Sequence, residues 1–447
     1  MLVWNRMRNF FPRALWVLLV CLLMAAACQP APPELRTLTI LHANDLHARF
    51  LPDDRGRGGF AHLATAIREE KRKSPGALVL HAGDLVQGAP VSSIYEGVPC
   101  YEVANALGFD AGTLGNHEFD YTWRRIADFL ETAAFPIVSA NVVDGAGRLV
   151  TPEPYVIREV NGVRVAVIGA LMENLHVLTK ENQRGDWRFL PVLPTVRKYA
   201  RQARPKADLV IVLGHLFDEE EEALLREAPE VNLVVGGHDH RGQKEARQAG
   251  NRLAVRVRAY GVELGRLDLK VDVANKEIAS FEWRRIPVGA ETHAPDPATA
   301  ELVDKWERKV SSLVDVVIGE ARRGFDRDEV RGLLETAMLE ATGADLAYMN
   351  DGGVRDELPA GKISVRQLWN IMPFDNVIAK GRVRGEDLPR ELLARGGVDP
   401  QREYVLVTND FVAEQWRQSA GGPRLEVQGT LDREAFLDYL KSRKALR

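Results

Sequence analysis

Histidine, aspartate and asparagine recur along the 447-residue sequence directly after short apolar runs. Five of the ten histidines stand at such positions, together with two aspartates and one asparagine. Imidazole, carboxylate and amide groups together suit borderline divalent metals such as Zn, Mn, Fe or Co. Two ions that share one carboxylate would need roughly seven or eight ligand positions. The residues are, in chain order, Asp45, His47, Asp84, Asn116, His117, His215, His238 and His240.

Buried strands that alternate with helices are expected to position these residues. An amphipathic pattern predicts a helix over 60–73, and each apolar run reads as a strand that leads to one of the polar residues. Because ligands bind at the carboxyl ends of strands in open α/β sheets, the polar residues should meet at one edge. Asn161-Gly162 between two β-rich runs predicts a hairpin, so the sheet is not purely parallel. The acidic run 218–222 is expected to be an exposed helix start. The predicted strands lie at 38–41, 77–81, 111–114, 210–213 and 231–235, with further strands over 252–273 and 280–288.

These motifs resemble the five blocks of calcineurin-like metallophosphoesterases. The third block, Gly115 to Asp120, is present in its full form and a second domain follows it. In both respects the chain is similar to the bacterial 5'-nucleotidase and UDP-sugar hydrolase family. The resemblance implies an α/β metallophosphoesterase sandwich of αββα layers over 36–290. A linker helix over 291–319 and a smaller α+β 5'-nucleotidase C-terminal domain over 320–447 would follow. The five blocks are Asp45-Leu46-His47, Gly83-Asp84, Gly115-Asn116-His117-Glu118-Phe119-Asp120, Gly214-His215 and Gly237-His238-Asp239-His240.

The resemblance also implies two divalent metal ions that share Asp84 as a bridging ligand. His117 would face the substrate phosphate rather than a metal, oriented by Asp120. Two cations close together acidify the water between them and supply hydroxide for attack on phosphorus. The ligands of one ion would be Asp45, His47, Asp84 and His240, and those of the other would be Asp84, Asn116, His215 and His238.

The second domain carries the residues to which the resemblance assigns the substrate. Two phenylalanines would stack on the faces of a flat base, and arginines would hold phosphate. For the arginines at 327 and 331 a solvated helix face is an equally good interpretation. After Phe411 the chain departs from the family, because Glu414-Gln415-Trp416-Arg417 stands where relatives have Gly-Gly-Asp-Gly. The nature of the nucleoside therefore stays open. The expected substrate-binding residues are Arg327, Arg331, Arg355, Phe374, Asn376 and Phe411.

Residues 1–27 are expected to be a signal peptide, because three arginines precede an apolar run over 14–27 that is short for a membrane span. Small residues before Cys28 resemble a lipoprotein cleavage box. We therefore expect export to the periplasm or outer membrane with a lipid on Cys28; the alternative is plain signal cleavage.

The expected activity is that of an exported dinuclear-metal phosphohydrolase, a 5'-nucleotidase-like enzyme that releases phosphate by metal-hydroxide attack. A 2',3'-cyclic-nucleotide phosphodiesterase or a UDP-sugar or nucleotide pyrophosphatase is the alternative. A non-catalytic metal-containing surface lipoprotein is an alternative of a different class. The formal net charge of -4 gives no basic surface for nucleic acid. The expected partner is a small phosphate ester, with a nucleotide as first candidate. The chain is expected to be a monomer that meets the membrane only through its lipid.

Overall fold

The computed structural model describes residues 34–419, 422–443 and 445–446. Its first sheet has four parallel strands extended by two antiparallel ones. The long antiparallel pair forms one edge of the sheet, and the parallel strands lead to loops that carry polar residues of the sequence motifs. In spatial order the strands are β14 (Glu277–Pro287), β13 (Glu263–Asp272), β1 (Leu35–Ala43), β2 (Leu78–His81), β3 (Ala111–Thr113) and β4 (Ile137–Val138).

A second six-stranded sheet has a parallel centre with an antiparallel strand at each edge. One edge is the predicted hairpin, in which Asn161 and Gly162 both have positive φ angles, 52° and 75°. Two consecutive residues with positive φ angles form a hairpin turn whose backbone twist matches the twist of the two paired strands. In spatial order the strands are β11 (Arg247–Ala249), β12 (Arg252–Val255), β10 (Leu233–Gly236), β9 (Leu209–His215), β7 (Val163–Leu171) and β6 (Tyr155–Val160).

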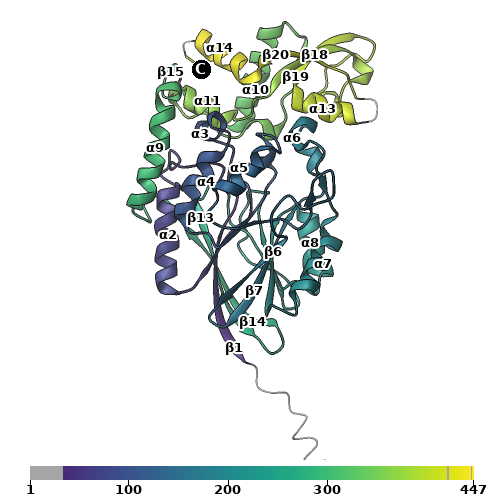
Figure 1. Cartoon of the computed structure of the whole chain (residues 1–447). Coiled ribbons are helices and arrows are strands. Elements are labelled where there is room, and N and C mark those ends of the chain that lie inside the picture. Colours follow the sequence, from purple (N-terminus) through teal and green to yellow (C-terminus); the bar gives the residue numbers. More distant parts are fainter. Residues whose placement is uncertain (1–33, 420–421, 444, 447) are drawn as a thin grey trace, which may run out of the picture.

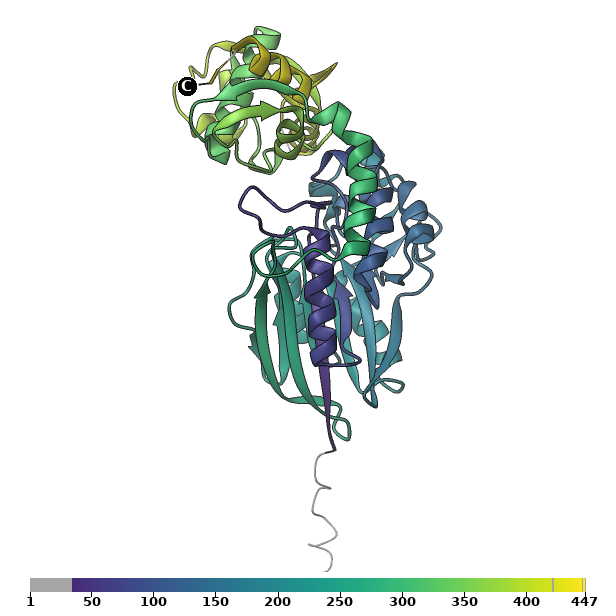
Figure 2. The ribbon, with the colours of Figure 1, turned by 90° about the vertical axis from the view of Figure 1, so that its left-hand side faces the viewer.

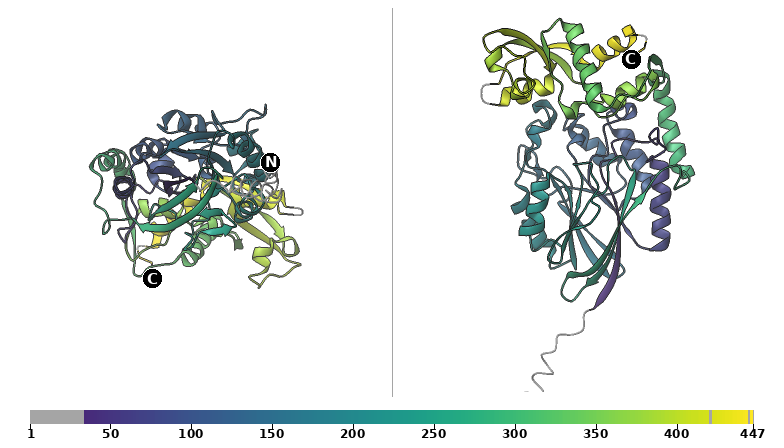
Figure 3. Two further views of the ribbon diagram at one scale, coloured as in Figure 1. Left: turned by 90° about the horizontal axis from the view of Figure 1, so that it is seen from below. Right: turned by 180° about the vertical axis from the view of Figure 1, so that it is seen from behind.

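The two sheets pack face to face, with helices on both outer faces (Figures 1 and 3). Ile40, Leu80, Val165 and Ile211 belong to the apolar layer between the sheets and are fully buried. Each such side chain stabilises the fold by about 1.5–3 kcal/mol. This arrangement is the αββα sandwich that the sequence predicts. The helices are α2 (Phe60–Lys73), α3 (Pro90–Ile94), α4 (Val98–Ala104), α5 (Arg125–Thr132) and α9 (Pro297–Val314) beside the first sheet, and α7 (Val192–Ala203) and α8 (Asp218–Glu227) beside the second.

The α9 helix leads from the sandwich to a second domain that stands over one end of the sheets (Figure 2). Asp296 caps this helix, since its side chain accepts a hydrogen bond from Thr299 N at 2.9 Å, and Pro297 occupies the first turn. The limits that we predict for the two domains stay a prediction. The second domain contains a four-stranded sheet, β16 (Leu346–Ala347), β19 (Glu403–Asn409), β18 (Val377–Arg384) and β20 (Glu426–Leu431), a pair, β15 (Val317–Ala321) and β17 (Gly361–Ser364), and the helices α10 (Arg327–Thr342), α11 (Val365–Ile371), α12 (Arg390–Leu393), α13 (Asp410–Gln418) and α14 (Asp432–Arg443).

Among the described residues, no helix has the length and apolar character needed to cross a membrane. The predicted signal peptide and Cys28 lie outside the described residues.

Candidate metal centre

The polar residues of the sequence motifs meet where strands of both sheets end. The β1, β2 and β3 strands lead to the loops of the first sheet, and β9 and β10 lead to those of the second. The side chains lie in or beneath a single cavity, and most are buried. All of the predicted metal ligands are in these loops or at the strand ends: Asp45, His47, Asp84, Asn116, His215, His238 and His240.

Five of these residues hold the left-handed backbone conformation, which costs a non-glycine residue roughly 1–2 kcal/mol. Their φ angles are 51° at Asp45, 49° at His47, 57° at Asp84, 83° at His238 and 63° at His240. Hydrogen bonds between the loops offset the cost, for example Asp45 N to Gly83 O at 3.0 Å and His47 N to Asp84 O at 3.1 Å. Such strain is typical of functional sites. Here it curls the loops so that their side chains converge.

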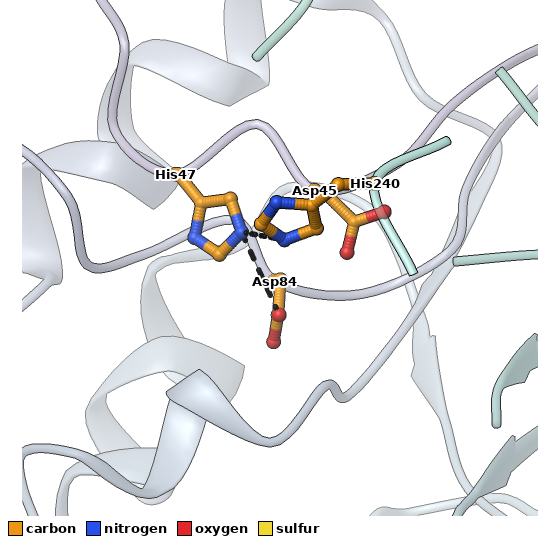
Figure 4. Close-up of side chains that lie close together, drawn as sticks. All are labelled: Asp45, His47, Asp84 and His240. Atoms are coloured by element: carbon orange, nitrogen blue, oxygen red, sulfur yellow. Dashed lines mark hydrogen bonds and ion pairs between the residues drawn. The ribbon is translucent and has the colours of Figure 1, made fainter. Parts of the chain in front are cut away.

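A first group of ligand atoms comes from Asp45, His47, Asp84 and His240 (Figure 4). One atom from each residue lies within 4.8 Å of the others. His47 Nε2 is 2.9 Å from His240 Nε2 and 3.8 Å from Asp84 Oδ2. Asp45 accepts hydrogen bonds from the side chain of Asn44 at 2.5 Å and from the backbone of His238 at 2.9 Å, which fix its carboxylate. Mixed imidazole and carboxylate donors at this spacing fit a divalent cation.

A second group meets the first at the same oxygen of Asp84, Oδ2. His215 Nε2 lies 3.1 Å from Asp84 Oδ2 and 3.1 Å from Asn116 Oδ1. His238 Nδ1 is also 3.1 Å from Asn116 Oδ1. His215 Nδ1 is 2.9 Å from the carbonyl oxygen of Ala82, which directs Nε2 toward the cluster. Asp84 therefore lies between both predicted ligand sets. The assignment of each residue to one ion stays a prediction.

Charges within the cluster set the protonation states that metals require. Burial alone would raise the pKa of Asp84, but His215 and His117 hold it well below its usual range. Burial lowers the pKa of His238 to about 3 and of His240 to about 2, so both imidazoles are neutral. Burial would lower the pKa of His215 too, yet Asp84 raises it to about 9. Ionised carboxylate and neutral imidazole are the metal-binding forms, and a cation would displace the His215 proton.

Glu118 belongs to the motif Gly115 to Asp120, and no role was predicted for it. Its side chain joins the loop that carries Asp84 to the loop that carries Asn116. Its buried carboxylate accepts hydrogen bonds from the backbone nitrogens of Asp84 at 3.2 Å, Leu85 at 2.9 Å and Gly115 at 2.6 Å. A Cβ atom on Gly115 would overlap the Asp84 carboxylate, so this position requires glycine. The motif thus sets the distance between Asp84 and the loop that carries Asn116.

The acidic run 218–222 is not uniformly exposed, contrary to expectation. Glu221 is 1% exposed because it binds the buried Arg256 at 2.6 Å. Arg256 also binds Asp218 at 2.8 Å and Asp239 at 2.7 Å. A buried arginine needs such partners, since an unpaired internal charge is strongly destabilising. Arg256 ties the helix after His215 to the loop that carries Asp239 and the two histidines beside it.

His117 and Asp120 form a pair on the wall of the cavity. His117 Nδ1 lies 2.7 Å from Asp120 Oδ2, and its Nε2 lies 4.0 Å from Asp84 Oδ2. Burial would lower the pKa of His117, but Asp120 and Asp84 raise it above its usual value. The ring of Phe374 stacks near that of His117, with centroids 5.8 Å apart. Asp120 therefore holds Nδ1 of His117, and the ring borders the space in which a ligand would lie.

A cavity of about 280 Å³ lies between the two domains. The first domain contributes metal-cluster residues and the His117 pair to its lining, and the second domain contributes four of the predicted substrate residues. One of them, Arg355, has a buried Nη2 with no hydrogen-bond partner, so this donor is available to a ligand. The four residues are Arg355, Phe374, Asn376 and Phe411.

Arg327 and Arg331 are on one face of α10 as expected, but they are absent from the cavity lining. Arg327 donates hydrogen bonds to Val354 O at 2.9 Å and to Asp351 O at 3.0 Å. Arg331 pairs with the side chain of Asp351. In this conformation both arginines hold the turn that carries Arg355, and their contact with substrate stays a prediction.

Several lining residues were missed because they belong to no motif. Lys180 is the most polar of them, and Tyr121, Leu178 and Gln183 are others. No local pattern marks these positions, and Lys180 contacts the second domain through Asn376 and Asp410, which follow it by 196 and 230 residues. A scan for lone lysines in the segments between strands would have found Lys180 only among many candidates.

Direct contacts hold the second domain over the metal loops. Arg49, two residues after His47, binds Asp356 across the interface at 2.9 Å. Ser93 Oγ donates to Pro373 O at 3.1 Å beside the Phe374 ring. Because Asp356 directly follows Arg355, the ion pair with Arg49 brings that arginine toward the metal cluster.

Two families match consecutive parts of the chain. Residues 38–242 match the calcineurin-like phosphoesterase family, and residues 317–397 match the family described as 5'-nucleotidase, C-terminal domain. Protein UshA of Yersinia enterocolitica is 27% identical over 88% of this chain and 82% of its own length. Endonuclease YhcR of Bacillus subtilis is 29% identical over 93% of this chain, which spans 40% of that protein. The crystal structure of a 5'-nucleotidase precursor from Thermus thermophilus has a TM-score of 0.82 at 25% identity, over 92% of this chain and 97% of that one.

Proposed function

The chain belongs to the 5'-nucleotidase family of metal-dependent, calcineurin-like phosphoesterases, and we propose that it releases phosphate from nucleotides at the cluster around Asp84. One observation carries the proposal. A single cavity is lined by residues of the metal cluster and His117 from the first domain and by Arg355 and two phenylalanine rings from the second. The residues proposed for phosphate chemistry and those proposed for base stacking therefore border the same space.

The residues divide the work by chemical type. Divalent cations held by the cluster supply Lewis-acid chemistry, since they lower the pKa of a water and polarise phosphoryl oxygens. We propose two ions, because two sets of ligand atoms share Asp84. His117 holds one proton on Nδ1, which donates to Asp120, and the neighbouring carboxylates raise its pKa, so in the protonated state its Nε2–H donates to the phosphoryl or leaving-group oxygen. Arg355 donates its free Nη2 to the phosphate and opposes the charge that develops there.

The substrate proposal rests on Phe374 and Phe411. Both rings line the cavity that the cluster borders, and neither is fully buried. Aromatic faces bind a flat base by stacking without reading its identity. Asn376 adds a polar group beside them. A nucleotide fits this arrangement, with its phosphate at the cluster and its base between the rings.

Phosphate release from a panel of substrates tests the proposed function. We expect hydrolysis of nucleoside 5'-monophosphates, complete loss with a chelator, and recovery on addition of Mn, Co or Zn, because the cluster is the only group proposed to activate water. The panel includes 2',3'-cyclic nucleotides, UDP-glucose and p-nitrophenyl phosphate. Cleavage of cyclic or diphospho compounds without monophosphates would identify a phosphodiesterase or pyrophosphatase instead. No hydrolysis of any ester would favour the non-catalytic lipoprotein.

We also propose that the protein is exported and carries a lipid on Cys28, on the basis of the charged and apolar leader and the small residues before this cysteine. In a bacterial host, the Cys28→Ser variant should move from the membrane fraction to the soluble periplasmic fraction, since the lipid is the proposed membrane contact. An unchanged distribution of Cys28→Ser would contradict lipidation at this residue.

A further inference from the structure

Lys180 reaches into the cavity from the first domain and contacts both segments that carry the phenylalanines. Its Nζ lies 3.0 Å from Asp410 Oδ2 and 3.4 Å from Asn376 Oδ1. Asp410 directly precedes Phe411, and Asn376 follows Phe374 by two residues. The Lys180 side chain is 15% exposed and lines the same cavity as both rings. It therefore lies at the edge of the base slot, by which we mean the part of the cavity bordered by the two rings.

The backbone of Lys180 is fixed relative to the catalytic pair. Lys180 precedes α6 (Glu181–Arg184), and its amide donates to the side chain of Gln183 at 2.8 Å. The same Gln183 side chain donates to the backbone oxygen of Asp120 at 3.1 Å. The position of the ammonium group is thus set from the first domain by Gln183 and from the second by Asp410.

The α13 helix completes this wall with the residues that depart from the family pattern. Glu414 accepts a hydrogen bond from the backbone nitrogen of Glu181 at 3.0 Å, and Gln415 donates to the backbone oxygen of His176 at 3.3 Å. The α6 and α13 helices accordingly lie side by side (Figure 1). Where relatives have a glycine-rich segment, this chain therefore has a helix that holds Lys180 and its neighbours at the base slot.

An ammonium group donates hydrogen bonds and cannot accept them. Because Lys180 can only donate, the Asn376 side-chain oxygen faces it and accepts one of its three hydrogens, and Asp410 accepts another. The third N–H of Lys180 is the donor that the edge of the base slot offers to a ligand. On the basis of the proposed nucleotidase function, we propose that Lys180 selects nucleotides whose base presents a carbonyl oxygen rather than an amino group.

The charges around Lys180 favour a neutral hydrogen-bond acceptor at this position over a second phosphate group of the substrate. The positive charge of Lys180 is already paired with Asp410, and Asp375, which also lines the cavity, is paired with Arg433. No unpaired positive charge of these residues is left for a second phosphate, whereas a carbonyl oxygen needs only the free donor. Guanine, hypoxanthine, uracil and thymine have such an oxygen, while adenine and cytosine carry an amino group at the corresponding position.

The test compares two substrate pairs that differ at that one position, IMP with AMP and UMP with CMP. For the wild-type protein with metal, kcat/KM should favour IMP and UMP by roughly tenfold or more, the value of one hydrogen bond to a charged group. Lys180→Met should bring both ratios to one or below, because Asp410 then becomes a free acceptor. The double variant Lys180→Met/Asp410→Asn puts a donor NH2 group in place of that acceptor and should restore part of the preference for IMP and UMP. In Asp410→Asn the side-chain oxygen can still accept from Val377 N, as Asp410 Oδ1 does at 3.1 Å.

Two controls separate selection by Lys180 from simple damage. Lys180→Met should lower kcat/KM for IMP and UMP more than for ribose 5-phosphate, which has no base. Phe374→Ala should lower kcat/KM for all four nucleotides alike and leave the IMP/AMP and UMP/CMP ratios at their wild-type values, because stacking does not read the exocyclic group. IMP/AMP and UMP/CMP ratios near one in the wild-type protein, or unchanged ratios in Lys180→Met, would overturn the role of Lys180. Neither result would affect the proposed nucleotidase function. Hydrolysis of ribose 5-phosphate but of none of the nucleotides would overturn the proposed function itself.

Discussion

Replacement of His117 by alanine is expected to lower kcat about a hundred- to ten-thousand-fold, the usual contribution of a positioned proton donor or acceptor. Its Nδ1 is held by Asp120 at 2.7 Å, so Nε2 carries out the chemistry on the cavity side. His117 Nε2 is 4.0 Å from Asp84, and the ring belongs to neither group of ligand atoms. The metal content of His117→Ala should therefore equal that of the wild-type protein, as measured by elemental analysis on the purified variants.

Asp120→Asn is the graded companion of this variant. Its amide oxygen can still accept from His117 Nδ1, but the negative charge that favours the protonated imidazole is lost. We expect a smaller fall in kcat than for His117→Ala, with KM for nucleotides little changed in both. A His117→Ala protein that has lost metal would show that His117 is a ligand, and one with normal kcat would remove it from the mechanism.

The convergence of the motif residues was predictable because they are close to strand ends. Each predicted ligand follows an apolar run by a few residues, and parallel strands of a sheet bring their carboxyl ends to one edge. The Asn161-Gly162 hairpin was predictable for the same reason, since two adjacent residues determine that turn. The α2 helix, with an amphipathic pattern over its full length, begins and ends at the predicted residues.

What could not be predicted depends on partners far away in the sequence. Glu221 looked like one of several exposed acids, yet it is buried because Arg256 comes to it from 35 residues away. The functional position of Lys180 depends on Asp410, 230 residues later. Arg327 and Arg331 share a helix face as expected, but the turn at Asp351 occupies their guanidinium groups. Local patterns carry no information about such pairings.

The second large effect is expected for Asp84→Asn, which should bind neither metal ion and lose measurable turnover. Asp84 is the residue that both ligand groups share, and its carboxylate is fully buried among imidazoles. A neutral amide gives weaker ligands and removes the negative charge that offsets two cations. The wild-type protein should become less stable on chelation, because a ligand present at about a hundred times its Kd stabilises the folded state by about 2.7 kcal/mol. The Tm of Asp84→Asn should not respond to metal or to chelator.

His240→Gln is the matched variant that separates a bridge from an ordinary ligand. His240 belongs only to the group with Asp45, His47 and Asp84, and glutamine also offers an oxygen ligand. We therefore expect His240→Gln to keep the ion of the His215 group, with a metal content between one and two ions per chain and partial activity. Asp84→Asn should contain none. Equal metal content in the two variants would contradict the bridging role of Asp84. The expected difference would support it, because only the loss of a shared ligand releases both ions at once.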